Sequence, residues 1–211
     1  MSSLNLWIKM LLIGDGGVGK SAFRRAWLGE SFRSQYLMTL GADFASKQVV
    51  LNYEPTETIY NIRFQIWDLA GQPRFKDVVD LFYRGAAGAL CFFDITNQGS
   101  FNGLHNWIDS FWTLNSQGKR PIIIVGAKCD LRNDPEFKSQ VTPEQGIEYA
   151  KDLTQNIKEE ADFTVHYIET SAKEDINVEK TFHLLATEII ASVHLKEQMK
   201  LSALRRLDEN K

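Results

Sequence analysis

The chain has 211 residues, a formal net charge of -3 and 24% charged residues, a composition typical of one folded domain. The slight acidic excess argues against a nucleic-acid-binding protein, because phosphate backbones are held by clustered lysine and arginine. Cys91 and Cys129 lack the spacing of a zinc site, so we expect free thiols in a reducing compartment and a cytoplasmic protein. The apolar runs are far shorter than the roughly 20 residues that span a bilayer.

Short apolar runs alternate with segments of helical periodicity, which predicts a mostly parallel sheet with helices on both faces. In chain order, the expected strand and helix pairs are 7–13 with a helix after Lys20, 89–94 with 101–114, and 122–127 with 143–153.

Residues 44–67 break this rhythm and predict two long strands joined by a turn at 52–57, with the antiparallel strand at one edge of the sheet. Apolar residues after Asn177 recur at spacings of four, three and four, which predicts an amphipathic final helix. The helical pattern either continues through Leu207 or gives way to a frayed tail. We therefore expect one domain over residues 1–195 and a helical extension or flexible tail over 196–211.

The segment GDGGVGKS, residues 14–21, fits the phosphate-loop pattern GxxxxGK[ST] between an expected strand and an expected helix. Its glycines let the backbone wrap a polyphosphate while the start of the helix points free N–H groups at the charge. Lys20 is expected to reach the outer phosphates and Ser21 to bind magnesium. A glycine-rich turn with an incidental lysine is the alternative, which the flanking strand and helix disfavour.

A second segment, WDLAGQPRF, follows directly after an expected strand. Asp68 stands where ligands bind in open α/β sheets and is expected to hold magnesium, although an aspartate there is also a common helix cap. Gly71 is expected to bring its N–H to a terminal phosphate, and Gln72 to orient an attacking water.

With these two segments in order, the chain resembles a small GTPase of the Ras superfamily, and is most similar to the Rab family up to about Ser192. The resemblance implies a three-layer α/β P-loop NTPase fold, with a six-stranded, mostly parallel sheet and one antiparallel edge strand. It also implies a molecular switch of vesicle trafficking that binds GTP and GDP with magnesium and slowly hydrolyses GTP.

The resemblance also implies further site residues. Thr39 resembles the threonine that binds magnesium and the terminal phosphate, and Phe32 resembles the aromatic residue beside the guanine. The segment ETSAK, residues 169–173, resembles the loop that encloses the base. The complete set of expected nucleotide-binding residues is Gly16, Gly17, Val18, Gly19, Lys20, Ser21, Ala22, Phe32, Tyr36, Thr39, Gly71, Lys128, Asp130, Leu131, Ser171, Ala172 and Lys173. The expected metal ligands are Ser21, Thr39 and Asp68, and the expected catalytic residues are Gln72, Lys20, Thr39 and Gly71.

One motif departs from the family. The base-reading loop, normally NKxD, reads Ala127-Lys128-Cys129-Asp130. Asp130 is expected to read the guanine and Lys128 to lie along it, but Ala127 lacks the amide of the family's asparagine. We expect weaker nucleotide binding, unless water or a neighbouring side chain substitutes.

Partners are expected to be effector, GTPase-activating and exchange proteins that contact the switch regions. Phe44, Trp67 and Tyr83 are expected to form an exposed partner-binding patch, with edge packing of the three side chains as the alternative. The sequence ends in LRRLDENK without a cysteine, so we expect no prenyl anchor and membrane contact only through partners. We also expect a monomer.

Two other functions remain open from the sequence. A nucleotide-bound interaction module with negligible turnover would share the same motifs. A P-loop kinase acting on a small molecule is disfavoured, because the segment from Asp68 to Gln72 and Asp130 suit water activation and guanine reading.

Overall fold

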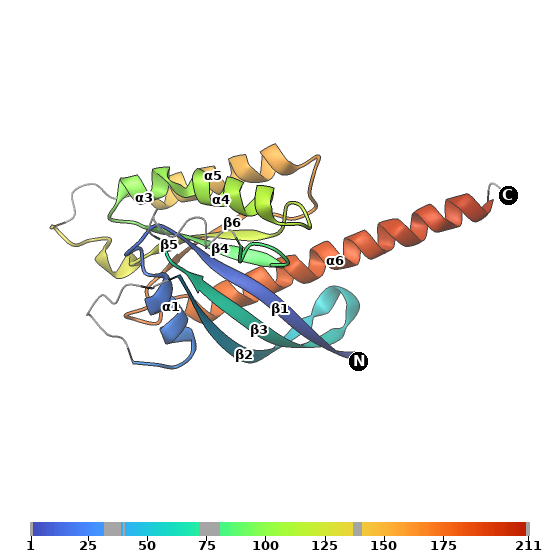
Figure 1. The fold of residues 1–211 in the computed structure, drawn as a ribbon, viewed down its shortest axis with the longest axis horizontal. Coiled ribbons are helices and arrows are strands. Elements are labelled where there is room, and N and C mark those ends of the chain that lie inside the picture. The colour runs from blue at the N-terminus through green and yellow to red at the C-terminus, as the bar shows by residue number, and fades with distance from the viewer. Residues whose placement is uncertain (1, 32–38, 40, 72–80, 137–140, 210–211) are drawn as a thin grey trace.

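The computed structural model describes residues 2–31, 39, 41–71, 81–136 and 141–209, with the backbone alone for residues 2 and 195–209. A six-stranded sheet in the order β2-β3-β1-β4-β5-β6 forms the middle layer (Figure 1). The strands are β1 Ser2–Gly14, β2 Ala42–Tyr53, β3 Thr58–Leu69, β4 Gly88–Asp94, β5 Ile122–Ala127 and β6 His166–Thr170. Among these six strands, only the edge pair β2–β3 is antiparallel, which confirms the expected sheet.

Helices cover both faces of this sheet. They are α1 Lys20–Trp27, α3 Gln98–Asn102, α4 Leu104–Leu114, α5 Pro143–Ile157 and α6 Val178–Glu209. Helices α1 and α6 lie on one face, and α3, α4 and α5 on the other (Figure 1). The fold is therefore the three-layer α/β architecture of a P-loop NTPase.

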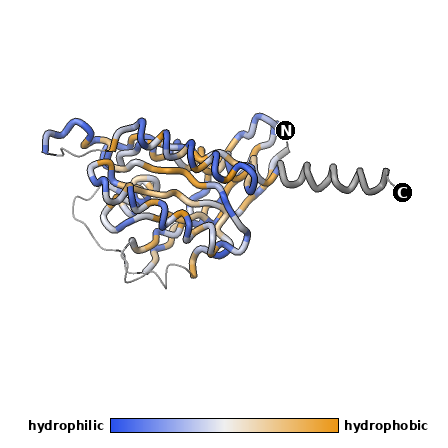
Figure 2. Tube along the Cα trace, turned by 90° about the horizontal axis from the view of Figure 1, so that it is seen from above, coloured by the Kyte–Doolittle hydropathy of each residue, from blue (hydrophilic) through white to orange (hydrophobic). Residues whose placement is uncertain are grey.

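The two faces of the sheet carry separate cores. Phe23, Phe92 and Phe182 meet on the face of α1 and α6, whereas Phe93, Phe111 and Tyr83 lie on the opposite face. Figure 2 shows apolar segments running through the middle of the molecule, with more polar segments outside. All seven residues of β4 and all six of β5 are buried, as expected for parallel strands covered on both sides.

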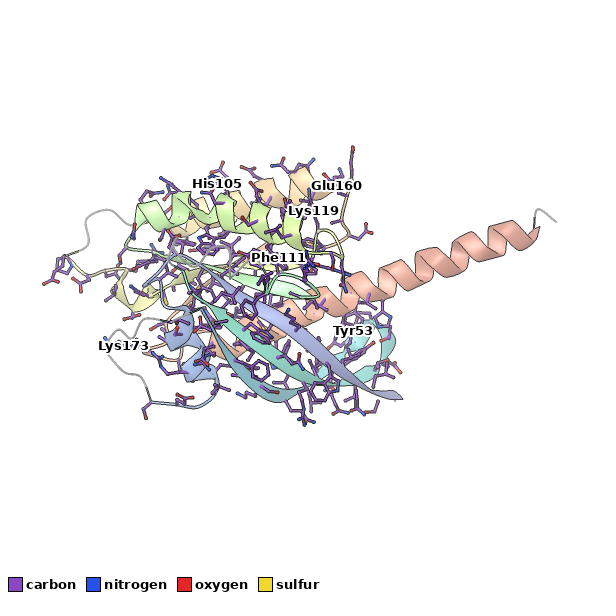
Figure 3. All side chains as sticks on the ribbon, viewed as in Figure 1. Tyr53, His105, Phe111, Lys119, Glu160 and Lys173 are labelled. Carbon is purple, nitrogen blue, oxygen red and sulfur yellow. The ribbon has the colours of Figure 1, made fainter. Side chains whose placement is uncertain are left out.

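The long hairpin occurs where the sequence predicts it, with the short 3-10 helix η1 Glu54–Thr56 between β2 and β3. Tyr53, the last residue of β2, is labelled in Figure 3 and stacks on His194 of α6 with ring centroids 5.5 Å apart. The single helix expected over 101–114 is instead two, because Asn97 caps a first short helix and the chain turns at Gly103.

The last helix is continuous to Glu209 and projects beyond the body of the molecule (Figure 1). Within the described part of the chain, no helix is both long enough and apolar enough to cross a membrane.

Candidate nucleotide-binding site

The phosphate loop connects the end of β1 to the start of α1. Gly14, Gly17 and Gly19 have φ values of 135°, 80° and 114°, a region that L side chains rarely adopt. A Cβ on Gly14 would also stand 2.2 Å from the carbonyl oxygen of Phe92 on β4. The glycines therefore fix a tight turn at the carboxyl end of the sheet, where open α/β folds bind ligands.

Lys20 is the first residue of α1 and is almost completely buried. Its Nζ donates to the carbonyl oxygens of Gly14 at 2.7 Å and Asp15 at 2.8 Å. Burial lowers the pKa of Lys20 to about 8, although the negative charges of Asp68 and Asp15 oppose the shift. The ammonium therefore sits inside the loop, without a carboxylate in hydrogen-bond contact among the described residues.

This lowered pKa predicts proton uptake when nucleotide binds. Near pH 8, about half of the free protein carries neutral Lys20, whereas the phosphates favour the ammonium. Binding of GDP at pH 8 is expected to take up about half a proton, and affinity is expected to fall as pH rises through 8. Calorimetry at pH 8 in buffers of different ionisation enthalpy measures this uptake. A binding enthalpy that is independent of the buffer would contradict the lowered pKa.

Asp68 lies at the end of β3 beside Lys20 and Ser21. Its side chain is completely buried, and neither carboxylate oxygen has a hydrogen-bond partner among the described residues. Burial raises its pKa, opposed by the hydroxyl of Ser21 and by the nearby cations Lys20 and Arg24. Arg24 Nε lies 3.9 Å from Asp68 Oδ2, which makes a long ion pair. A buried carboxylate that accepts no well-formed hydrogen bond is costly unless another group binds it.

Two hydroxyl groups complete this corner of the site. The Oγ of Ser21 and the Oγ1 of Thr39 lie 3.0 Å apart. Magnesium prefers hard oxygen ligands, such as hydroxyl groups, one carboxylate and substrate phosphates, over nitrogen or sulfur ligands. In the described part of the chain, no group of three or more histidine, cysteine or acidic residues offers another metal site. The donor set therefore fits magnesium.

Gly71 approaches the phosphate loop more closely than any side chain would allow. A Cβ on this residue would stand 2.3 Å from the carbonyl carbon of Asp15 and 2.4 Å from the amide nitrogen of Gly16. Only glycine fits at this distance from backbone atoms. The backbone at Gly71, just after β3, is therefore in direct contact with the loop that holds Lys20.

The base side of the site is built from β4, the loop after β5 and the loop after β6. Lys128, with φ of 66°, directs its Nζ to Asp94 Oδ2 at 2.6 Å. Asp130 Oδ1 accepts a 2.7 Å hydrogen bond from Ser171 Oγ, and its other oxygen lies 3.8 Å from Lys173 Nζ. Lys173 is exposed at the end of the molecule beside α1 (Figure 3). The fold therefore brings the two expected base loops together.

Ala127 lies between this base loop and the phosphate loop. It is 5% exposed, and its Cβ lies 3.6 Å from the position that a Cβ on Gly19 would take. Its methyl group offers no hydrogen bond to either loop. Position 127 is therefore where the amide of the family's asparagine would meet the phosphate loop.

Sequence reasoning missed three supporting contacts. Trp107 Nε1 on α4 donates to Asp15 Oδ1 at 2.8 Å and so holds the phosphate loop from outside. Arg132 forms an ion pair with Glu169, with Nε 3.0 Å from Oε2, and thereby links the two base loops. Asp94, the partner of Lys128, is the last residue of the buried strand β4, and an acidic residue at a strand end was the signal available in the sequence.

The other residues predicted to bind the nucleotide differ in their burial. Val18, a residue of the phosphate loop, is buried in the core, Ala172 packs against the core on the α1 side, and Ala22 and Leu131 are partly buried. Phe32, Tyr36 and Gln72 lie outside the described residues.

The predicted partner patch requires one correction. Phe44 and Trp67 lie side by side with ring centroids 5.1 Å apart, and Phe44 is 49% exposed. Tyr83 is wrong as a member, because it is only 1% exposed and packs against Phe111 in the core. Its neighbour Phe82 lies against Trp67 instead, at 5.0 Å. The prediction therefore chose the wrong one of two adjacent aromatic residues, because Phe82 lies at the patch and Tyr83 faces the core.

Comparison with known proteins agrees with this geometry. The Ras family profile matches residues 9–191, which include both expected base loops and the phosphate loop. The chain belongs to the Ras family. It is 38% identical to the Ras-related protein Rab-8A of Bos taurus over 188 residues, which cover 89% of this chain and 81% of that protein. Identity is 36% to Rab-8B of Homo sapiens, with the same coverage, and 36% to Rab-8 of Diplobatis ommata, with 89% and 80% covered.

The family resolves the choice between functions. This Ras-family chain is a Rab-like small GTPase: it binds GTP and GDP with magnesium and hydrolyses GTP to GDP and phosphate. Membership does not favour an interaction module with negligible turnover. Effectors, GTPase-activating proteins and exchange factors are its general classes of partner.

Proposed function

We propose that the residues of the phosphate loop, Thr39, Asp68 and Gly71 form the phosphate and magnesium half of the GTPase site. The buried carboxylate of Asp68, which accepts no well-formed hydrogen bond among the described residues and lies adjacent to Ser21, carries this proposal. The ion pair with Arg24 is long, at 3.9 Å, and Lys20 donates to backbone carbonyls, so the carboxylate oxygens are available to a bound cation.

In this assignment, Lys20 exchanges its two carbonyl acceptors for phosphate oxygens, while the N–H groups at the start of α1 face the same charge. Ser21, Thr39 and Asp68 hold magnesium. When bound, this ion neutralises negative charge on the phosphate oxygens and orients the terminal phosphate. Gly71 places its N–H beside the loop, and Gln72 orients the attacking water.

Asp130 and Lys128 form the base half, with Ser171, Ala172 and Lys173 enclosing the guanine. The carboxylate of Asp130 accepts hydrogen bonds from the ring N–H and the amino group of guanine, a pair of donors that adenine does not present. The ion pair of Lys128 with Asp94 supports a stem that lies along the base.

Switching follows from Thr39 and Gly71, because each belongs to a segment whose position depends on the terminal phosphate. The segments around 36–43 and 71–81 are held while GTP is bound and released after hydrolysis. We expect intrinsic hydrolysis to be slow and an arginine from a partner to accelerate it, by about 10³ to 10⁵ for known GTPases.

Phe44 and Trp67 form the partner patch, with Phe82 in place of Tyr83. The net charge of -3 supports a protein partner over nucleic acid. The free thiols Cys91 and Cys129 support a reducing compartment and thus a cytoplasmic chain. The proposal further takes the chain to act as a monomer and to reach membranes through partners.

Replacing Asp68 with asparagine tests the magnesium assignment. In the wild type, magnesium is expected to slow release of a fluorescent GDP strongly relative to EDTA. The Asp68→Asn variant is expected to lose most of that difference, because an amide is a weaker and uncharged metal ligand. The control is Asp43→Asn, since Asp43 is 54% exposed and paired with Arg24 nearby. An unchanged magnesium response in Asp68→Asn would remove this residue from the metal site.

A further inference from the structure

The side chain of Asp15 in the phosphate loop is held by helix α4. Trp107 Nε1 on α4 donates to Asp15 Oδ1 at 2.8 Å, although the two residues are 92 positions apart in the chain. Gly103, where α3 gives way to α4, lies on the same side, because a Cβ on it would stand 3.3 Å from Asp15 Oδ2. Both oxygens of the carboxylate therefore face the corner between α3 and α4.

This contact matters because the first part of the loop is almost entirely glycine. Among residues 14–17, which we call the glycine segment, Asp15 is the only residue with a side chain. Gly16 and Gly17 are exposed, and Gly17 has a φ of 80°. Glycine loses more conformational freedom on ordering than any other residue. Asp15 is therefore the one position through which a side chain can anchor the glycine segment.

The backbone of Asp15 also contacts two groups assigned to the phosphates. Its carbonyl oxygen accepts from Lys20 Nζ at 2.8 Å. Gly71 packs on the peptide between Asp15 and Gly16, since a Cβ on Gly71 would stand 2.3 Å from the carbonyl carbon and 2.4 Å from the amide nitrogen. A displacement of Asp15 would therefore disturb the surroundings of both Lys20 and Gly71.

The loop is tied to both faces of the sheet. Val18 is buried in the core on the face of α1 and α6, whereas Trp107 packs against the core on the face of α4 (Figure 1). Asp15 and Val18 flank the exposed Gly16 and Gly17. The two anchors thus fix both ends of the turn that is assigned to the phosphates.

We propose that Trp107 is a positioning residue for the nucleotide: through its hydrogen bond to Asp15 it holds the glycine segment in the phosphate-binding turn and so slows the release of GDP. The inference rests on the proposed phosphate assignment of this loop and adds a residue of α4 to it. Ordering the loop before the nucleotide arrives lowers the entropy cost of binding. The bond is charge-assisted, because its acceptor is a carboxylate, and such bonds are stronger than neutral ones.

A different role for Asp15 predicts the opposite result. If its negative charge acted only by repelling the phosphates, every substitution that removes the charge would slow GDP release. If Asp15 is an anchor, Asp15→Ala speeds release, whereas Asp15→Asn keeps an oxygen that accepts from Trp107. The direction of the change therefore separates the two roles.

The experiment measures release of a fluorescent GDP from the full chain in magnesium by stopped flow. Trp107→Phe keeps an aromatic ring and loses the N–H, and is expected to release GDP about tenfold faster. The matched control is Trp112→Phe, which removes another indole hydrogen bond of α4, to the carbonyl oxygen of Arg120, and is expected to leave release unchanged.

Variants of Asp15 test the same bond without a change in α4. Asp15→Ala is expected to speed release as much as Trp107→Phe, and Asp15→Asn to restore release close to the wild-type rate. Because both substitutions break one bond, adding Trp107→Phe to Asp15→Ala is expected to have no further effect. A general loosening of α4 would instead make the two effects add.

Four results would overturn the inference: equal release from wild type and Trp107→Phe, an equal acceleration in Trp112→Phe, slower release from both Asp15 variants, or additive effects in the double variant. Magnesium dependence of release from the wild type tests the phosphate assignment separately. If magnesium slows that release and Trp107→Phe changes nothing, only the role of Trp107 fails. A wild type that retains no GDP would contradict the assignment of the loop itself.

Discussion

Replacing Gly71 with alanine is expected to slow GTP hydrolysis about 100-fold, with a much smaller effect on GDP binding. The added Cβ would stand 2.3 to 2.5 Å from backbone atoms of Asp15 and Gly16, which form part of the phosphate loop. Because these contacts involve backbone on both sides, Gly71 itself must move away. A displacement of about 1 Å at a reacting centre is enough for a loss of this size.

Single-turnover hydrolysis of loaded GTP measures the effect. Gly99→Ala is the matched control, because its added Cβ meets only the side-chain oxygen of Asn97, at 3.1 Å. Hydrolysis at the wild-type rate in Gly71→Ala would show that the close approach of Gly71 to the loop has no part in the reaction.

Replacing Ala127 with asparagine is expected to slow GDP release by about 2- to 150-fold. The estimate follows from one or two net hydrogen bonds of about 0.5–1.5 kcal/mol each. Position 127 is buried and its Cβ lies against Gly19, so the new amide reaches both the base and the phosphate loop. The wild type is accordingly expected to release nucleotide faster than relatives that carry the asparagine.

Stopped-flow release of a fluorescent GDP compares wild type and variant, with Ala161→Asn as a control for an amide added at a partly buried alanine outside the site. Asp130 is intact in each protein, so GDP is expected to bind more tightly than ATP throughout. Equal release rates in wild type and Ala127→Asn would mean that water or another group already supplies the missing contacts.

Local sequence patterns were sufficient for the chain order of the first five strands and most of the helices and for the phosphate loop, whereas β6 was implied only by the resemblance. Both depend on periodicity and on neighbouring residues, such as Gly19 before Lys20. The pairing of Asp130 with Ser171 joins residues 41 positions apart, and only the resemblance to a family indicated it. The contact from Trp107 to Asp15 spans 92 positions and had no sequence signal.

Errors arose where one residue decides the direction of a side chain. Phe82 and Tyr83 are both aromatic, and no periodicity in that segment indicates which of them faces the core. The break at Gly103 was likewise hidden, because apolar residues recur at helical spacing on both sides of it. Such details depend on tertiary contacts.

The central claim is that this chain turns over GTP at a magnesium site completed by Gln72. The most direct measurement is single-turnover hydrolysis of GTP loaded with magnesium, in wild type and Gln72→Leu, with free GTP as the blank. We predict first-order conversion to GDP on the order of 10⁻⁴ to 10⁻² per second in wild type, and slower conversion in the variant at nearly unchanged GTP affinity. Loaded GTP that is hydrolysed no faster than free GTP, or equally fast in both proteins, would contradict the account.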